Sequence, residues 1–258
     1  MKFNVDKCKV MHFGHSNPEN SYKMNGTELQ VVKEEKDRGV MIADNLKPSV
    51  HCTQQYGKTN RMLGLLKRTV VSRNPASLLK MYKTIVRPHV EYCVSIWSPS
   101  YKKDKETIER VQHRFTRLFK ELRGLYNDRL SELGLWSLEE RHNRADLVEV
   151  FKIITGQSSV PASTFFDFNS DTRMRGHSLK LLKHHSVENI RSHFFSERVI
   201  NRWNRLPSDV ATVKSINSFK AGLQRVRGAL SSTSSWTSSP QSRYGHSLGM
   251  TQQVSNNR

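Results

Sequence analysis

The hydrophobic pattern changes its period near residue 50, and this change limits the possible fold more than any other feature. Residues 1–46 contain short apolar runs, separated by polar turns, that are typical of strands: CKVMHFG, YKM, TELQVV and RGVMIA. Asn25-Gly26, between the second and third runs, indicates a β-hairpin because both residues tolerate a positive φ. From residue 53 onward, apolar residues recur at helical spacing. We therefore expect an α+β chain that is mainly α, with a small antiparallel β region followed by a helical bundle.

Local start and stop signals place the helices. Asn74 followed by Pro75 indicates a helix start, and Pro88 breaks or kinks that helix. We expect a further helix to begin with Asp104 as its cap and to run to residue 122. Ser137 and Glu140 form an S-x-x-E capping box that begins another helix, which ends at Gly156. Pro207 ends the first of two short C-terminal helices.

These signals divide the chain into five parts. We expect a β region at 1–46, a helical region at 53–156, a polar linker or loop at 157–187, and a second helical region at 188–228. Residues 229–258 are rich in Ser, Thr and Gln, a composition typical of disorder. The four short strands make a poor isolated domain, because few strands without a covering helix leave an apolar face exposed.

The charge of the chain favours a polyanionic ligand. The formal net charge is +19, and residues 58–123 alone hold 16 basic and five acidic residues. Such a localised excess indicates nucleic acid first and an anionic membrane surface second.

No apolar stretch approaches the roughly 20 residues that cross a bilayer, and no secretory signal is visible. Cys8, Cys52 and Cys93 lie far apart without a C-x-x-C pair, so we expect reduced thiols in an intracellular protein.

The candidate nucleic-acid-binding residues lie in this basic block. Arg110, Arg114 and Arg117 follow helical spacing, so they share one face opposite the apolar stripe of their helix. Guanidinium groups match phosphate oxygens bidentately. The full predicted set is Lys58, Arg61, Lys67, Arg68, Arg110, Arg114, Arg117 and Lys120. The alternative is an ordinary solvated basic face. We expect most of the aromatic residues nearby to be core residues rather than base-stacking platforms: Tyr56, Tyr82, Tyr92, Trp97 and Trp203.

No catalytic or metal-binding constellation stands out. Two-metal polymerisation needs paired carboxylates, and the sequence contains no Asp-Asp pair. The adjacent acidic pairs are Glu34-Glu35, which we place in a charged hairpin loop, and Glu139-Glu140, which suits the first turn of a helix. The histidines are scattered, and neither G-x-G-x-x-G nor G-x-x-x-x-G-K occurs. We therefore predict no metal ligands and no cofactor.

Five segments occur in a familiar order: FNVDKCKVMHFG, YKMNGTELQVVKEEKDRGV, LLKMYKTIVRPHVEYCVSIWSP, IERVQHRFTRLF and HFFSERVINRWNRLP. Together they resemble the C-terminal part of reverse transcriptases from non-LTR retrotransposons of the LINE, jockey-like kind, over residues 1–228. The resemblance implies that the chain begins inside the polymerase palm, and that a helical thumb and a C-terminal connection follow. The sequence departs from the family at Arg38, where Leu is usual; that charged side chain either disturbs palm packing or lies at an edge.

The resemblance also implies roles that this chain only partly carries. The family is an RNA-directed DNA polymerase, a nucleotidyltransferase that uses Mg, but the aspartates that hold the metal are missing here. Lys7 matches the Lys of the family's FN..KC pattern, which implies a position near the leaving pyrophosphate in an intact enzyme. The alternative is an exposed strand lysine. We expect no polymerase activity from this chain alone.

The expected function is therefore sequence-non-specific binding of an RNA or DNA template–primer through backbone contacts of the basic thumb. The missing N-terminal palm and fingers are a second expected partner, no membrane is expected, and the expected location is intracellular, nuclear or cytoplasmic. Two alternatives remain open: a non-enzymatic nucleic-acid-binding protein with a new use, and a retroelement relic without function.

Overall fold

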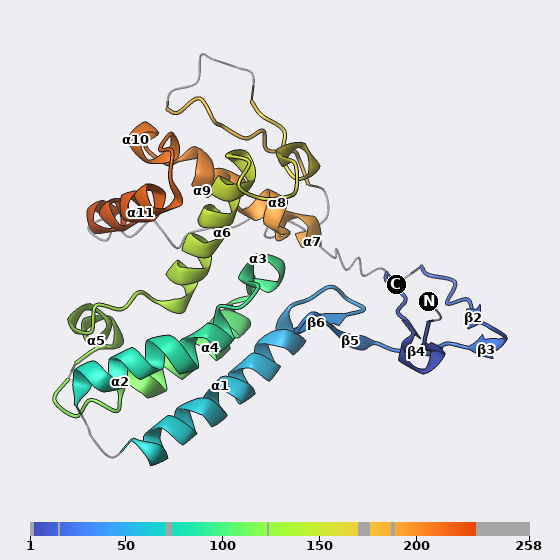
Figure 1. Cartoon of the computed structure of the whole chain (residues 1–258), viewed down its shortest axis with the longest axis horizontal. Helices are drawn as coiled ribbons and strands as arrows, with labels where there is room; N and C mark the ends of the chain where they lie inside the picture. Colours follow the sequence, from blue (N-terminus) through green and yellow to red (C-terminus); the bar gives the residue numbers. More distant parts are fainter. Residues whose placement is uncertain are drawn as a thin grey trace, which may run out of the picture.

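The computed structural model describes residues 3–14, 16–70, 74–122, 124–169, 176–186 and 189–230. The chain is 54% helix and 9% strand, with small two-stranded sheets near the N-terminus followed by helices. Figure 1 shows the first strands extending away from two groups of helices, one built around α1 and α4 and the other around α6 and α11. The predicted fold class, mainly α with a small β region, is confirmed.

The first strands are very short. Asn25 and Gly26, with φ values of 51° and 82°, form the turn between β2 (Lys23–Met24) and β3 (Thr27–Glu28), so the predicted hairpin is confirmed. After a 3-10 turn, η1 (Val5–Lys7), strand β1 (Lys9–Val10) pairs in parallel with β4 (Gln30–Val31). The sequence predicts an antiparallel β region, but this pair of strands is parallel.

A second hairpin joins the β region to the helices. Strands β5 (Glu34–Asp37) and β6 (Val40–Ala43) are antiparallel and meet at a two-residue turn of Arg38 and Gly39, with φ values of 44° and 92°. The prediction of a loop at Glu34-Glu35 is wrong. The apolar β6 buries Val40 and Ala43, so the charged β5 occupies the outer edge, where charged side chains are common. Arg38 is exposed at the tip of this turn, so its charged side chain lies at an edge and does not enter a packed core.

The first group of helices forms around two parallel neighbours. It contains, in chain order, α1 (Ser49–Thr69), α2 (Pro75–Met81), the π turn η2 (Tyr82–Val86), the 3-10 turn η3 (Arg87–Val90), α3 (Val94–Trp97), α4 (Lys102–Thr116) and α5 (Tyr126–Glu132). The first turns of α1 and α4 are joined by Ser49 Oγ, which donates to Asp104 Oδ2 at 2.6 Å. Further along, Leu63 and Leu66 of α1 share a core with Val111 and Phe115 of α4.

Several helix boundaries follow the local signals and others do not. Asn74 caps α2 by accepting from Ser77 N at 3.2 Å, and the regular α-helix ends before Pro88, as predicted. The predicted cap at Asp104 is wrong. α4 begins at Lys102, so Asp104 lies in its first turn and its carboxylate bonds to α1 instead. α4 also ends at Thr116, earlier than the predicted residue 122.

The long helix α6 (Leu138–Ile154) links the two groups. Its capping box is formed as predicted: Ser137 Oγ accepts from Glu140 N at 3.2 Å, and Glu140 Oε2 accepts from Ser137 N at 2.9 Å. The carboxylate of Glu109 on α4 accepts from Leu138 N at 2.8 Å, so it satisfies a further free amide of this helix end. α6 ends before Gly156, whose φ of 69° is typical of a helix C-terminus.

The second group of helices packs against the C-terminal half of α6. It contains η4 (Ala162–Thr164), α7 (Asn189–Ser192), α8 (Phe195–Arg198), α9 (Ile200–Asn204), α10 (Ser208–Ala211) and α11 (Ile216–Leu230). Phe151 of α6 stacks on Phe219 of α11 with ring centroids 4.5 Å apart, and Trp203 of α9 is fully buried beside them. The predicted polar linker packs onto this core through Phe166 and Leu181. The predicted tail lies outside the described residues, apart from its first two.

A buried ion pair fixes the second group to the first. Arg198 of α8 donates from Nε and Nη2 to the two carboxylate oxygens of Asp146 on α6, at 3.0 and 2.9 Å. The side chain of Asp146 is 1% exposed and that of Arg198 is 12% exposed. Arg198 Nη2 also donates to the Ser95 carbonyl of α3 at 2.8 Å. One guanidinium therefore joins α3, α6 and α8.

We predict that Arg198→Met lowers the free energy of unfolding by about 3–5 kcal/mol, because it leaves the Asp146 carboxylate buried without its cation. Urea denaturation measures the change. The matched control is Arg225→Met, which removes an exposed pair with Asp209 at 3.6 Å and should cost only about 0–1 kcal/mol. Equal losses in the two variants would contradict the structural role of Arg198.

Candidate nucleic-acid interface

The structure exposes all of the predicted binding cations. On α1 these are Lys58, Arg61, Lys67 and Arg68, and around α4 they are Arg110, Arg114, Arg117 and Lys120. Within the described part of the chain, none of these side chains forms an ion pair with a carboxylate. Their charge is therefore available to a ligand.

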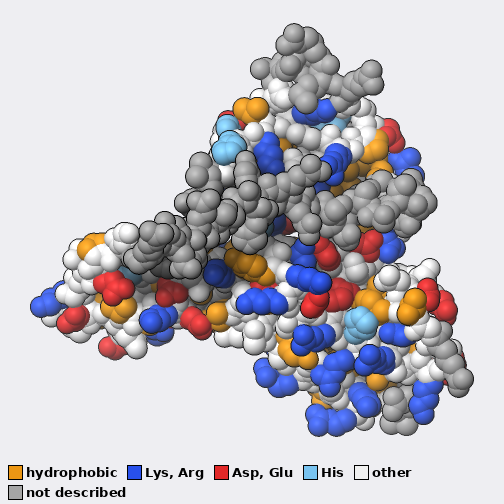
Figure 2. All heavy atoms as spheres, turned by 180° about the vertical axis from the view of Figure 1, so that it is seen from behind, with side chains coloured by type: hydrophobic (Ala, Val, Ile, Leu, Met, Phe, Trp, Pro, Cys, Tyr) orange, Lys and Arg blue, Asp and Glu red, His pale blue; other side chains and the backbone are white. Residues whose placement is uncertain are grey.

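The cations of α4 share one face of that helix. Arg110 and Arg114 lie on the side opposite Ile108, Val111 and Phe115, which are all buried. Arg117 is the C-cap residue and Lys120 lies in the turn beyond it, so these two continue the face past the helix end. Figure 2 shows Lys and Arg side chains gathered over the lobe built from the first group of helices. A row of cations at this spacing suits the repeated phosphates of a nucleic-acid backbone.

A groove of about 730 Å³ opens between the tip of the β5–β6 hairpin, α1 and η3. Its walls carry Lys36 and Arg38 from the hairpin, and Lys58 and Arg61 from α1. No carboxylate of the described residues belongs to its lining. An open groove with four cations and no anion attracts phosphate, since guanidinium and ammonium groups bind its oxygens strongly. We call it the basic groove.

One aromatic ring stands in the basic groove. Tyr92 is 54% exposed and its hydroxyl donates to the Arg38 carbonyl at 3.1 Å. The ring lies so close to the hairpin that a Cβ on Gly39 would come within 3.2 Å of Tyr92 Cε1. The hairpin tip therefore needs Gly at this position. Tyr92 is the exception to the expected burial of the aromatic residues, because Tyr82, Trp97 and Trp203 are buried and Tyr56 is half-buried.

His89 completes the groove from η3. Partial burial, and secondarily the charge of Lys58, lower the pKa of His89 below its ordinary value. At neutral pH its imidazole is therefore uncharged and can donate or accept a hydrogen bond. Lys36, Arg38 and His89 were not predicted as binding residues. They come from segments that are far apart in the sequence, and no local signal shows that these segments meet.

A buried histidine holds the hairpin wall in place. Met41 N, on the free edge of β6, donates to His51 Nδ1 of α1 at 3.0 Å. The centroid of the Trp97 ring lies 4.6 Å from that of His51 and 5.4 Å from that of His142. His142 Nε2 is 2.7 Å from the Val90 carbonyl, so this nitrogen carries the proton. The His51 imidazole must be neutral to accept its bond, and burial disfavours the charged form of His142.

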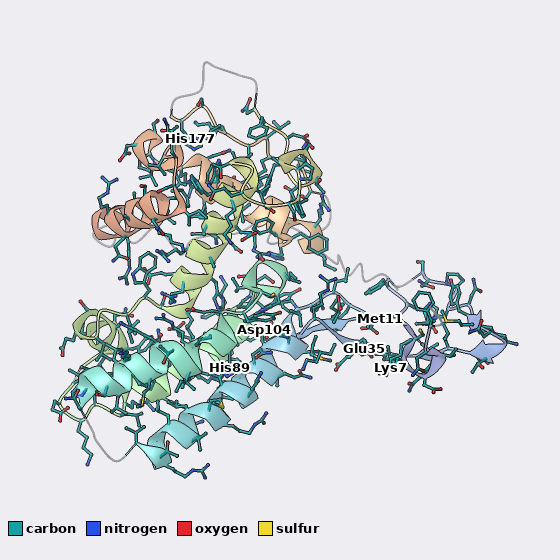
Figure 3. All side chains as sticks on the ribbon, viewed as in Figure 1. Lys7, Met11, Glu35, His89, Asp104 and His177 are labelled. Atoms are coloured by element: carbon teal, nitrogen blue, oxygen red, sulfur yellow. The ribbon has the colours of Figure 1, made fainter. Side chains whose placement is uncertain are left out.

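The remaining predicted residues lie elsewhere. Lys7 is exposed on η1, and Figure 3 shows it in the N-terminal part, well apart from His89. Glu35 binds Lys9 at 2.5 Å and Glu139 binds Lys105 at 2.7 Å. Glu140 serves in the α6 capping box. These three carboxylates thus make structural contacts, and the described residues contain no group of His, Cys, Asp or Glu that would hold a metal ion.

Comparison with known proteins finds no family model, no curated protein and no solved structure that matches this chain. Among the described helices, none has the length and apolar content needed to cross a membrane.

We predict that the protein loses stability as the pH falls from about 6.5 to about 4. Burial lowers the pKa of both His51 and His142 from 6.5 to about 4. Above pH 6.5 neither the folded nor the unfolded chain protonates these groups. Between the two pKa values the unfolded chain binds protons that the folded chain does not, so the free energy of unfolding declines.

Urea denaturation at a series of pH values measures this decline. His142→Gln keeps a donor for the Val90 carbonyl but removes one titrating group, so the decline should become shallower. The control is His184→Gln, an exposed residue paired with Asp167 at 2.8 Å, which should leave the slope as it is. The same slope in His142→Gln as in the unaltered chain would contradict the prediction.

Proposed function

We propose that this protein binds nucleic acid without sequence specificity, through the phosphate backbone, using the first group of helices. One observation carries the proposal: the eight predicted binding cations on α1 and around α4 are exposed and have no carboxylate partners among the described residues, and no carboxylate of those residues lines the basic groove between the hairpin, α1 and η3. Phosphate contacts of this kind give affinity and position but do not read bases.

We further propose that the nucleic acid is a template–primer, RNA or DNA, and that the chain is the C-terminal part of a non-LTR retrotransposon reverse transcriptase. The support is the order of five sequence segments, from FNVDKCKVMHFG to HFFSERVINRWNRLP. Short strands followed by basic helices are what this resemblance leads us to expect. Because the sequence contains no Asp-Asp pair, we expect nucleotide incorporation only after the missing palm and fingers are supplied.

We place the protein inside the cell, in the nucleus or the cytoplasm. Its three cysteines are free, and a nucleic-acid ligand is found in those compartments.

We predict a steep salt dependence of binding. If about 6–10 phosphates are contacted, the affinity for a duplex should fall about 10³–10⁵-fold between about 50 and 200 mM salt. Fluorescence anisotropy with a labelled oligonucleotide measures it. Arg110→Gln with Arg114→Gln should reduce the slope of log K against log salt by about 2, since each phosphate contact contributes ~0.9. Lys214→Gln with Arg225→Gln removes two exposed cations of the second group of helices and should leave the slope unchanged. An affinity that does not change with salt concentration would contradict the proposal.

Tyr92 provides a test of the basic groove itself. We predict that Tyr92→Ala weakens binding of a single-stranded oligonucleotide roughly five- to a hundred-fold, because a base stacked on an aromatic ring gains ~1–3 kcal/mol. Tyr92→Phe keeps the ring and should bind nearly as well. The matched control is Tyr22→Ala, because Tyr22 is equally exposed, at 53%, but lies outside the groove. Equal affinity in the Tyr92→Ala and Tyr22→Ala variants would exclude stacking at this site.

A further inference from the structure

A second concentration of positive charge lies beside the basic groove and belongs to none of the surfaces described so far. It consists of Lys83 on η2, Arg87 on η3, and Arg141 and Arg144 on α6. We call it the arginine cluster. None of its members lines the basic groove. It brings together two segments about fifty residues apart in the sequence.

Among the described residues, Glu91 is the carboxylate that pairs with members of the cluster. Glu91 Oε1 lies 3.3 Å from Arg87 Nε and also accepts from Arg141 Nε, while Glu91 Oε2 accepts from Arg141 Nη2 at 3.1 Å. Both oxygens of Glu91 are thus engaged by two guanidiniums. Four cations against one carboxylate leave an excess of three positive charges.

Arg144 and Lys83 supply the unbalanced charge. The Arg144 guanidinium lies 5.5 Å from the Trp136 ring, and its hydrogen bond to the Lys220 carbonyl is long, at 3.4 Å. Its Nε is buried and has no hydrogen-bond partner within the described part of the chain. Lys83 is half-buried and, among the described residues, forms no hydrogen bond or ion pair. Neither side chain is therefore held by a carboxylate.

Burial and the neighbouring positive charges both lower the pKa of Lys83 and of Arg144. Burial lowers the pKa of Lys83, and the charges of Arg87 and Arg141 lower it further. Burial likewise lowers the pKa of Arg144, followed by the charge of Arg141. Half-buried cations repel one another more strongly than cations in water, because the local dielectric is lower. Such an arrangement destabilises the empty protein and favours an added anion.

We propose that the arginine cluster is an oxyanion site that binds one phosphate group. Arg87 and Arg141 already converge on the oxygens of Glu91, and a guanidinium offers two parallel N–H donors that match the oxygens of phosphate as well. The phosphate comes either from the backbone of the bound nucleic acid or from a free phosphate. The site stands independently of the basic groove and of the cations on α4.

Thermal unfolding in inorganic phosphate, compared with chloride at equal ionic strength, tests the site. We expect Tm to rise with phosphate concentration and to saturate, as for a ligand that binds only the folded chain. In Lys83→Gln and in Arg144→Gln the apparent dissociation constant should increase roughly tenfold, the value of a lost charge-assisted hydrogen bond. Lys214→Gln, an exposed cation elsewhere, should respond like the unaltered chain.

The Lys83→Gln variant separates loss of phosphate binding from loss of folding. Lys83 holds no neighbouring side chain, so its replacement should leave Tm in chloride equal or raise it by roughly 2–4 °C through relieved repulsion. Equal stabilisation by phosphate and chloride would overturn the proposal. So would an unchanged phosphate response in both cluster variants.

A short oligonucleotide separates the two sources of phosphate. If it suppresses the phosphate-dependent rise in Tm, and Lys83→Gln reduces the salt slope of its binding by about 1, the site holds a backbone phosphate. If its binding is insensitive to Lys83→Gln while inorganic phosphate still binds, the site holds a free phosphate. If inorganic phosphate does not stabilise the unaltered chain but the oligonucleotide still binds it, the oxyanion site is overturned and the proposed function stands.

Discussion

The buried pair of Arg198 and Asp146 is the interaction on which the arrangement of the helices depends. A carboxylate that is 1% exposed is tolerated only beside a cation with good geometry, and Arg198 supplies both of its parallel donors. The same guanidinium reaches backbone carbonyls of α3. α6 contributes Leu138 to one core and Leu147 through Ile153 to another, so it belongs to both groups of helices. The ion pair and α6 together keep the second group from pivoting on the first.

The positively charged side chains fall into two sets, one that joins elements of the fold and one that faces solvent. The cations that hold elements together have carboxylate partners: Arg198 with Asp146, Arg227 with Glu140, and Lys105 with Glu139. Within the described part of the chain, the eight predicted binding cations on α1 and around α4 stand outside such pairs and face solvent. A protein that needed only solubility would gain nothing by concentrating unpaired cations on one lobe, because like charges at short range repel. The separation of paired structural cations from unpaired exposed ones is what a backbone-binding protein requires.

Local chemistry predicted those elements whose ends are set by neighbouring residues. The capping box at Ser137, the cap at Asn74 and the turn at Asn25-Gly26 each depend on side chains within four positions, and each is present. Strand β5 could not be predicted in this way, because the segment EEKD has low strand propensity and pairs only because β6 is buried beside it. Asp104 has the chemistry of a cap, but its partner Ser49 lies 55 residues away. The basic groove is hidden from the sequence for the same reason: its cations come from a hairpin and a helix that meet only in the fold.

The π turn and the 3-10 turn around Pro88 bring the two basic sites together. Proline cannot donate the amide hydrogen bond that a continuing α-helix needs, so the regular helix ends at Met81 and changes its pitch twice before Glu91. Tyr82, fully buried and bonded to Gln112 at 3.0 Å, fixes the start of this irregular stretch. Within it, Arg87 turns toward Glu91 and α6, while His89, two residues later, lines the groove beside α1. π turns occur frequently at functional sites. Here the π turn and the 3-10 turn after it form one short segment that places a side chain in each of two anion-attracting environments, so both sites depend on the same irregular stretch of backbone.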